Sequence, residues 1–249
     1  NEAFVIYAQT RERLIAEDSN SVDLIKSFPA GRDVKRYKQP PYNKYLILMP
    51  KGWTRAKSNG SKDAFGWLKQ TYPAIANHML PFAEAAQKRC DKGEYWWELR
   101  ACDYYPEFEK PKLVYPDVCM QPEFTFDDCG SYLNKTCFMM ALSDKYLLGI
   151  LNSSVMYFVI KGIIPELRGG YYTLGISYVE TFPIRTIDFS KTDDLAHHQL
   201  MISLVDQMLS LHKQLQAANT PHDKTSLQRQ IEATDRQIDA LVYELYGLT

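Results

Sequence analysis

Short apolar runs separated by turn-forming residues mark the middle of the chain. Between residues 95 and 185, Val, Ile, Tyr and Phe gather in four runs, and Pro, Gly, Asp and Asn separate these runs. This pattern is typical of strands joined by turns. We therefore expect the folded core here, with strands at 112–115, 124–126, 137–142 and 155–160.

The preceding part of the chain mixes strand and helix patterns. Residues 1–28 predict a short apolar strand and then a helix from Ser21, whose hydroxyl can cap the first free amides. Residues 44–49 predict a buried strand, and 51–61 a loop rich in Gly, Ser and Lys. From 62 to 92 the apolar positions recur at helical spacing, interrupted by a proline.

The last sixty residues have a different period. Apolar side chains alternate at spacings of three and four, and the sequence Asn219, Thr220, Pro221 between the two sets is typical of one helix ending and another starting. We therefore predict an α+β fold: a mixed, curved sheet with flanking helices over 1–190, then an antiparallel two-helix hairpin over 191–249. The predicted seam residues are Met201, Leu204, Met208, Leu211, Leu215, Leu227, Ile231, Thr234, Ile238, Leu241 and Leu245.

Charge is unevenly distributed along this nearly neutral chain of 249 residues, whose formal net charge is -1. Nine Lys and Arg residues lie between residues 31 and 62, against Asp33 alone, and Tyr37, Tyr42, Tyr45 and Trp53 are interleaved with them. Such a segment can neutralise phosphates while its aromatic rings pack on sugars or bases. The alternative interpretation is a basic face that only contacts solvent.

A second candidate is the loop Arg168-Gly169-Gly170-Tyr171-Tyr172-Thr173. Its two glycines allow the backbone to approach a phosphate closely, and the flanking Arg and Thr can reach base edges or backbone oxygens. The alternative is an ordinary glycine turn between a helix and a strand. Further cations, Arg100, Lys110 and Lys112, lie near predicted strand ends.

Catalytic patterns are weak. Gln39-Pro40-Pro41-Tyr42 is similar to the Pro-Pro-Tyr motif of amino methyltransferases, but Gln replaces the Asp, Asn or Ser that binds the target amino group, and no G-x-G loop follows a strand. Asp23, Asp33 and Lys35 would suit an Mg²⁺-dependent nuclease, which is one alternative function. The pair His197-His198 has no spaced partner, so we predict no metal site and no catalytic residues in this chain.

The cysteine spacing and the hydropathy of the chain indicate where in the cell the protein acts. The five cysteines contain no C-x-x-C pair, and the longest apolar passage is broken by Asn152, Ser153 and Ser154. We therefore expect a cytoplasmic protein without a membrane span. Since the chain begins at Asn1 without Met and at once becomes apolar, we also expect it to be part of a longer polypeptide.

Several short motifs, in a fixed order, resemble one family. The chain resembles the TaqI-like C-terminal specificity domain, the target recognition part of type IIG restriction-modification enzymes and related adenine-specific DNA methyltransferases. The motifs lie at residues 1–6, 31–37, 95–100 (YWWELR), 110–112, 146–153 (YLLGILNS), 182–184 and 238–248.

The resemblance implies recognition of a specific double-stranded DNA sequence for an adenine methyltransferase and endonuclease. S-adenosylmethionine and Mg²⁺ would then act in other domains of the parent polypeptide. A further alternative is a protein-interaction module that acts through its helical hairpin. By position, we expect phosphate contacts from Arg32, Lys35, Arg36 and Lys57, and groove contacts from Arg100, Lys112, Arg168, Tyr171, Tyr172 and Thr173.

Overall fold

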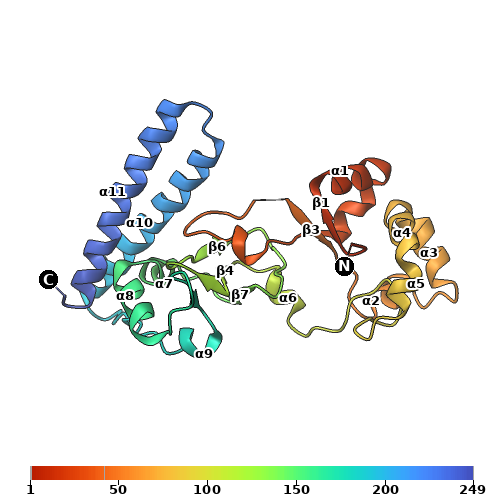
Figure 1. Cartoon of the computed structure of the whole chain (residues 1–249), viewed down its shortest axis with the longest axis horizontal. Helices are drawn as coiled ribbons and strands as arrows, with labels where there is room; N and C mark the ends of the chain where they lie inside the picture. The colour runs from red at the N-terminus through yellow and green to blue at the C-terminus, as the bar shows by residue number, and fades with distance from the viewer. Residues whose placement is uncertain (1, 42, 249) are drawn as a thin grey trace. The chain divides into compact units, whose positions relative to one another are not determined.

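The computed structural model describes residues 2–41 and 43–248 (Figure 1). The chain divides into two compact units. The first unit comprises Asn1–Pro29, Pro41–Lys110 and Cys129–Tyr132, and the second comprises Ala30–Pro40, Pro111–Asp128 and Leu133–Thr249.

The first unit contains a three-stranded antiparallel sheet in the order β1-β3-β2. The strand predicted at 44–49 is confirmed as β3, whereas the predicted helix is a short 3-10 helix that does not start at Ser21. That residue lies in a 3-10 turn whose start is capped by the Asp18 carboxylate, and the chain then extends so that Ile25 pairs with Ile47. These elements are β1 (Val5–Tyr7), α1 (Ala8–Glu17), η1 (Ser19–Leu24), β2 (Ile25–Ser27) and β3 (Lys44–Ile47).

Short helices make up the remainder of the first unit. The helical pattern over 62–92 is confirmed, and Pro73 and Pro81 each occupy the start of a new helical segment, where a missing amide costs nothing. The loop predicted over 51–61 instead contains a helix, α2. The elements are α2 (Trp53–Lys57), α3 (Ala64–Thr71), α4 (Pro73–Met79), η3 (Leu80–Phe82), α5 (Ala83–Gln87) and α6 (Tyr105–Phe108).

The second unit holds two small antiparallel sheets, β6-β4-β7 and β5-β8. The strands predicted at 112–115, 124–126 and 137–142 are confirmed, but the one at 155–160 is wrong, because these residues lie in helix α8. The Ser153 hydroxyl accepts a hydrogen bond from the Met156 amide and thereby caps this helix. The elements are η2 (Gly31–Asp33), β4 (Lys112–Pro116), β5 (Val118–Cys119), β6 (Thr125–Asp127), β7 (Cys137–Met140), α7 (Lys145–Leu151), α8 (Ser154–Ile163), β8 (Tyr172–Thr173) and α9 (Ile176–Val179).

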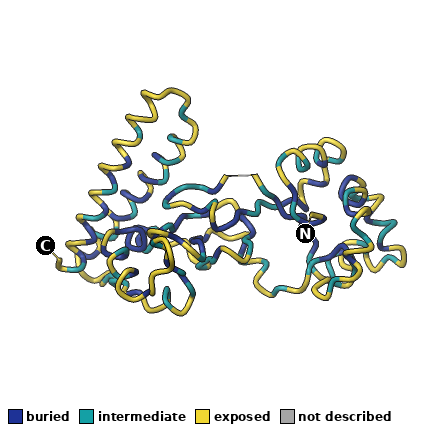
Figure 2. The backbone as a smooth tube through the Cα atoms, viewed as in Figure 1, coloured by how far each residue is buried: buried dark blue, intermediate teal, exposed yellow. Residues whose placement is uncertain are grey.

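Helices α10 (Thr192–Ala217) and α11 (Pro221–Leu245) form the predicted antiparallel hairpin. The Thr220 hydroxyl accepts a hydrogen bond from the Asp223 amide, which fixes the start of α11. Most of the predicted seam is buried, and only Leu215 and Leu227, near the connection, are half-buried. Figure 2 shows buried segments recurring between exposed ones along the two helices. The apolar seam is therefore buried inside the second unit, where its side chains belong to the core.

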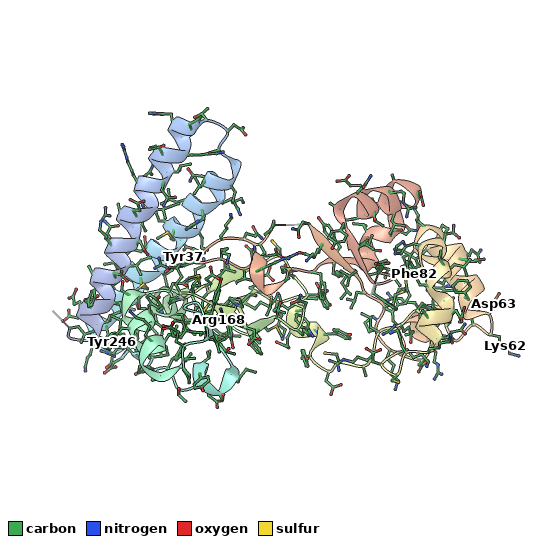
Figure 3. The ribbon with its side chains drawn as sticks, viewed as in Figure 1. Tyr37, Lys62, Asp63, Phe82, Arg168 and Tyr246 are labelled. Atoms are coloured by element: carbon green, nitrogen blue, oxygen red, sulfur yellow. The ribbon has the colours of Figure 1, made fainter. Side chains whose placement is uncertain are left out.

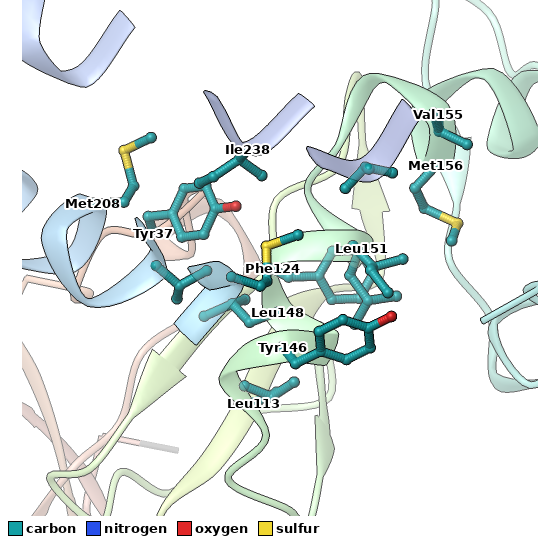
Figure 4. Packing of buried hydrophobic residues seen from close by; sticks show 14 of the residues in the cluster. Tyr37, Leu113, Phe124, Tyr146, Leu148, Leu151, Val155, Met156, Met208 and Ile238 are labelled. Atoms are coloured by element: carbon teal, nitrogen blue, oxygen red, sulfur yellow. The ribbon is translucent and has the colours of Figure 1, made fainter. Parts of the chain in front are cut away.

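The α+β class is thus confirmed, although the strands of two to five residues are divided among small antiparallel sheets instead of one mixed sheet. A large apolar cluster lies in the second unit, with contributions from β4, α7, α8, α10 and α11 (Figure 4), and a smaller one comprises Val34, Val114 and Cys137. Tyr37, from the basic segment, belongs to the large cluster together with Met208 and Ile238. The cluster therefore fixes both the hairpin and part of the basic segment on the β6-β4-β7 sheet.

Within the described residues, no single helix has the length and apolar character needed to cross a membrane. Helices α7 and α8 meet that criterion only as a pair bent by 60°.

Candidate nucleic-acid interface

The predicted glycine loop forms the tip of a narrow two-stranded ribbon, β5-β8. The Leu167 amide donates to the Tyr171 carbonyl at 2.7 Å, which closes the loop. Gly169 and Gly170 have φ angles of +88° and +80°, a conformation that residues with a Cβ rarely adopt. Arg168 is therefore held at an exposed bend in the second unit (Figure 3).

The strand register decides which ribbon side chains face outward. Cys119 pairs with Tyr172, and both are buried, whereas Tyr171 is exposed and Thr173 half-buried. The Tyr172 hydroxyl donates to the Glu166 carboxylate at 3.4 Å. Of the four loop residues proposed to approach a groove, Arg168 and Tyr171 are thus well exposed, and Tyr172 is a core residue.

The cysteine on the inward face of the ribbon, Cys119, is unreactive. Burial, and after it the nearby Glu123 carboxylate, raises the pKa of the Cys119 thiol to about 12. The thiol therefore stays protonated at neutral pH and does not act as a nucleophile.

The basic segment is less available than its sequence indicates. Lys35 forms an ion pair with Glu123 at 2.8 Å, and Arg36 forms one with Asp235. Arg32 is the most exposed of the three, with 77% of its side chain accessible, and only a distant pairing to Asp33 at 3.9 Å. Of these three cations, Arg32 is therefore the most accessible to a phosphate.

Arg36 joins the basic segment to the hairpin. Its guanidinium donates to the Asp235 carboxylate at 2.7 and 2.5 Å and to the Asn152 carbonyl at 2.5 Å. The adjacent Tyr37 is fully buried with a φ of +56°, and burial raises the pKa of its hydroxyl. Arg36 and Tyr37 therefore anchor the segment on the core, which the sequence did not indicate.

Lys112 lies inside the protein. Its ammonium is 2.6 Å from the Asp127 carboxylate, and the two side chains are 0% and 3% exposed. The register of β4 with β6 places these residues directly opposite each other. The sequence suggested a groove contact at a strand end, but the structure leaves Lys112 no surface for one.

In the first unit, a buried carboxylate holds the basic helix α2. Glu98 is fully buried and accepts hydrogen bonds from the amides of Gly52 and Thr54 at 3.0 and 2.9 Å. Negative charge at a helix start is stabilising. Lys57 at the other end of α2 is exposed and has no ion pair within the described residues. Glu98 therefore positions a surface cation, a role that sequence reasoning missed.

The aromatic run beside Glu98 is structural. Trp97 is buried and donates from Nε1 to the Thr54 hydroxyl at 3.0 Å, and its ring contacts Trp96 at a centroid distance of 5.3 Å. This agrees with the expectation that at least one of the two tryptophans is buried. Arg100, a few residues later, is exposed and keeps its candidate role.

Two of the three candidate catalytic residues, Asp33 and Lys35, have other partners. Asp33 accepts from the Ala30 amide at 2.9 Å, so its carboxylate closes the η2 turn. Asp23 belongs to the first unit, whereas Asp33 and Lys35 belong to the second. Across residues 2–41 and 43–248, no group of three or more His, Cys, Asp or Glu side chains could hold a metal ion. Tyr42, the last residue of the Pro-Pro-Tyr sequence, lies outside the described residues.

The chain thus has an α+β fold. The second unit presents Arg168 at the end of the β5-β8 ribbon, and the first unit presents Lys57 at the end of helix α2. Residues 26–184 match the family model of the TaqI-like C-terminal specificity domain, and the chain belongs to this family.

Among solved structures, the chain is similar to the type IIL restriction-modification enzyme MmeI, which was determined in complex with DNA. The TM-score is 0.60 at 12% sequence identity, over 99% of this chain and 31% of that chain. This chain therefore spans about a third of the length of MmeI. No curated protein sequence matches it.

Proposed function

We propose that this chain is the sequence-specific double-stranded DNA recognition domain of a restriction-modification enzyme. The observation that carries the proposal is Arg168, an exposed arginine without an ion pair in the described part of the chain, at a glycine bend in a member of this specificity-domain family. A guanidinium can donate two hydrogen bonds to O6 and N7 of guanine, the commonest specific contact in the major groove.

Affinity and specificity come from different residues in this proposal. Lys57 and Arg32 are exposed cations that contact phosphates and release counterions, whatever the DNA sequence. Arg168, with Tyr171 and Thr173 beside it, contacts base edges, while Arg100 is a further candidate near the groove. The paired Lys35 and Arg36 contribute through the position of the segment more than through direct contacts.

We further propose that the reactions occur in other domains of the parent enzyme. An adenine methyltransferase with S-adenosylmethionine, and an endonuclease with Mg²⁺, would modify and cut the site that this domain holds. The hairpin would serve as a spacer toward those domains, and the whole enzyme would act on DNA in the cytoplasm. The similarity to 31% of the MmeI chain supports a domain of this kind.

The test is fluorescence-anisotropy binding of this chain to random duplex DNA, single-stranded DNA and duplex RNA across a salt series. We expect preference for duplex DNA, with the logarithm of affinity falling linearly with the logarithm of salt concentration. Selection from a random duplex pool then identifies the preferred site. Equal binding to all three nucleic acids, or selection without enrichment, would contradict sequence-specific recognition.

A further inference from the structure

The outward face of the β5-β8 ribbon carries three large apolar side chains beside the polar Thr173. Val118, Met120 and Tyr171 are 43%, 51% and 41% exposed, while Cys119 and Tyr172, which alternate with them, are in the core. Three large apolar side chains on so small a strand pair form a surface patch. Such patches on proteins mark sites of contact with another molecule.

The methyl end of Met120 reaches the tip of the ribbon because the loop has no side chain there. A Cβ built on Gly170 would lie 3.9 Å from Cε of Met120, and one on Gly169 would lie 3.6 Å from the ring of Tyr171. The methyl group of Met120 and the ring of Tyr171 therefore lie beside the glycine bend that carries the exposed Arg168. Methionine is flexible and polarisable, which suits contact with a small apolar group.

Charge favours DNA as the molecule that covers this patch. Arg168 has no ion pair within the described residues, and the neighbouring acid Glu166 accepts a hydrogen bond from the Tyr172 hydroxyl. Asp117 lies at the opposite end of the ribbon, where its carbonyl accepts from the Leu174 amide. The tip thus combines apolar side chains with the Arg168 cation, while the Glu166 carboxylate binds the Tyr172 hydroxyl.

The major groove matches this chemistry. It is about 12 Å wide, admits a two-stranded ribbon, and carries base acceptors for a guanidinium together with one apolar group, the C5-methyl of thymine. Building on the proposed function, we propose that Met120, with Tyr171 beside it, contacts the C5-methyl group of a thymine in the recognised site. Met120 is then a specificity-determining residue for an A·T pair.

The experiment uses this chain and the site found by selection. Each thymine is replaced in turn by uracil, which removes only the C5-methyl group, and dissociation constants are measured by fluorescence anisotropy. We expect one replacement to weaken binding about fourfold, the value of one buried methyl-sized group. Met120→Ala should lose this difference between thymine and uracil, and Met120→Leu should retain most of it.

Leu200→Ala is the matched control, because Leu200 is exposed to a similar extent, 49%, on α10 in the same unit. It should keep the preference for thymine. Circular dichroism and the melting temperature establish that each variant is folded.

Several results would overturn the inference while leaving sequence-specific recognition intact. They are a selected site without an A·T pair, equal binding of all thymine and uracil duplexes by the wild type, and an unchanged thymine preference in Met120→Ala. Failure of the selection itself would instead contradict the proposed function, and this inference with it.

Discussion

The guanidinium of Arg36 forms two hydrogen bonds with the carboxylate of Asp235, at 2.7 and 2.5 Å, across 199 residues of sequence. The pair connects the basic segment to α11, and about a quarter of each side chain is exposed. It therefore contributes to holding the hairpin in the second unit.

We predict that Arg36→Ala lowers the free energy of unfolding by about 1.5–3 kcal/mol, because charged hydrogen-bond partners are left incompletely satisfied. Urea unfolding measures the change. The double variant Arg36→Met with Asp235→Leu should recover part of the loss, since no unpaired carboxylate remains. If the effects of Arg36→Met and Asp235→Leu, each measured alone, add up to the effect of the double variant, the two residues are not coupled and the prediction is contradicted.

The buried pair Lys112 and Asp127 should behave differently from a DNA contact. Lys112→Ala leaves a buried carboxylate without its cation and should cost about 3–5 kcal/mol of stability, measured by chemical denaturation. The double variant Lys112→Met with Asp127→Leu should be close to the wild type in stability. In this folded double variant, DNA affinity should be unchanged. A loss of affinity there would restore a direct role for Lys112 in DNA binding.

Two glycines in neighbouring helices provide a test of the hairpin contact. A Cβ on Gly149 in α7 would lie 2.3 Å from Sδ of Met201 in α10, whereas one on Gly162 in α8 would meet nothing within 4 Å. Gly149→Ala should therefore destabilise the protein by about 1–3 kcal/mol through overpacking. Gly162→Ala should stabilise it by about 0.5–1 kcal/mol, because alanine is the better helix former. Thermal unfolding of the two variants, with opposite shifts, checks this contact between α7 and α10.

His212 makes stability dependent on pH. Burial, followed by the nearby Arg36 and Lys38, lowers the pKa of this imidazole below its ordinary value of 6.5, although Asp235 acts in the opposite direction. The unfolded chain therefore binds a proton near pH 6.5 while the folded chain does not, so stability falls as the pH decreases from 6.5 toward the lowered pKa.

Urea unfolding at a series of pH values should show that His212→Gln reduces this loss of stability. His222→Gln, at an exposed position on α11, is the control and should not change it. Part of the pH dependence should persist in His212→Gln, because burial also lowers the pKa of His78 in the first unit. An unchanged pH dependence in His212→Gln would contradict the assignment.

Arg168 and Lys57 should separate specificity from affinity. Arg168→Ala should lose about 1–3 kcal/mol of discrimination between the selected site and a site changed at one G·C pair. Lys57→Ala should weaken binding to both sites alike and reduce the salt slope by about 1. Anisotropy titrations on both duplexes measure these effects. A uniform loss of affinity in both variants would contradict this division of roles.

The sequence by itself determined the features that depend on local periodicity. The seam from Met201 to Leu245 and the break at Thr220 repeat over many residues, so the hairpin was predictable. The apolar runs at 112–115, 124–126 and 137–142 were also sufficient to predict strands β4, β6 and β7. The sequence of helix α8 predicts a strand because Val, Ile, Tyr and Phe favour strands. In the structure Ser153 caps a helix, and the Val155, Met156 and Ile160 side chains of this helix pack in the core.

Only the tertiary structure decided which charged residues are available at the surface. In the sequence, Lys112 and Arg36 are basic residues that cannot be told apart from Lys57 and Arg168. In the structure, Lys112 forms an ion pair with Asp127, and Arg36 forms one with Asp235. Those partners are brought into place by strand register and helix packing, over 15 residues in one case and 199 in the other. An ion pair depends on a distance between side chains, and the order of residues along the chain does not specify that distance until the chain has folded.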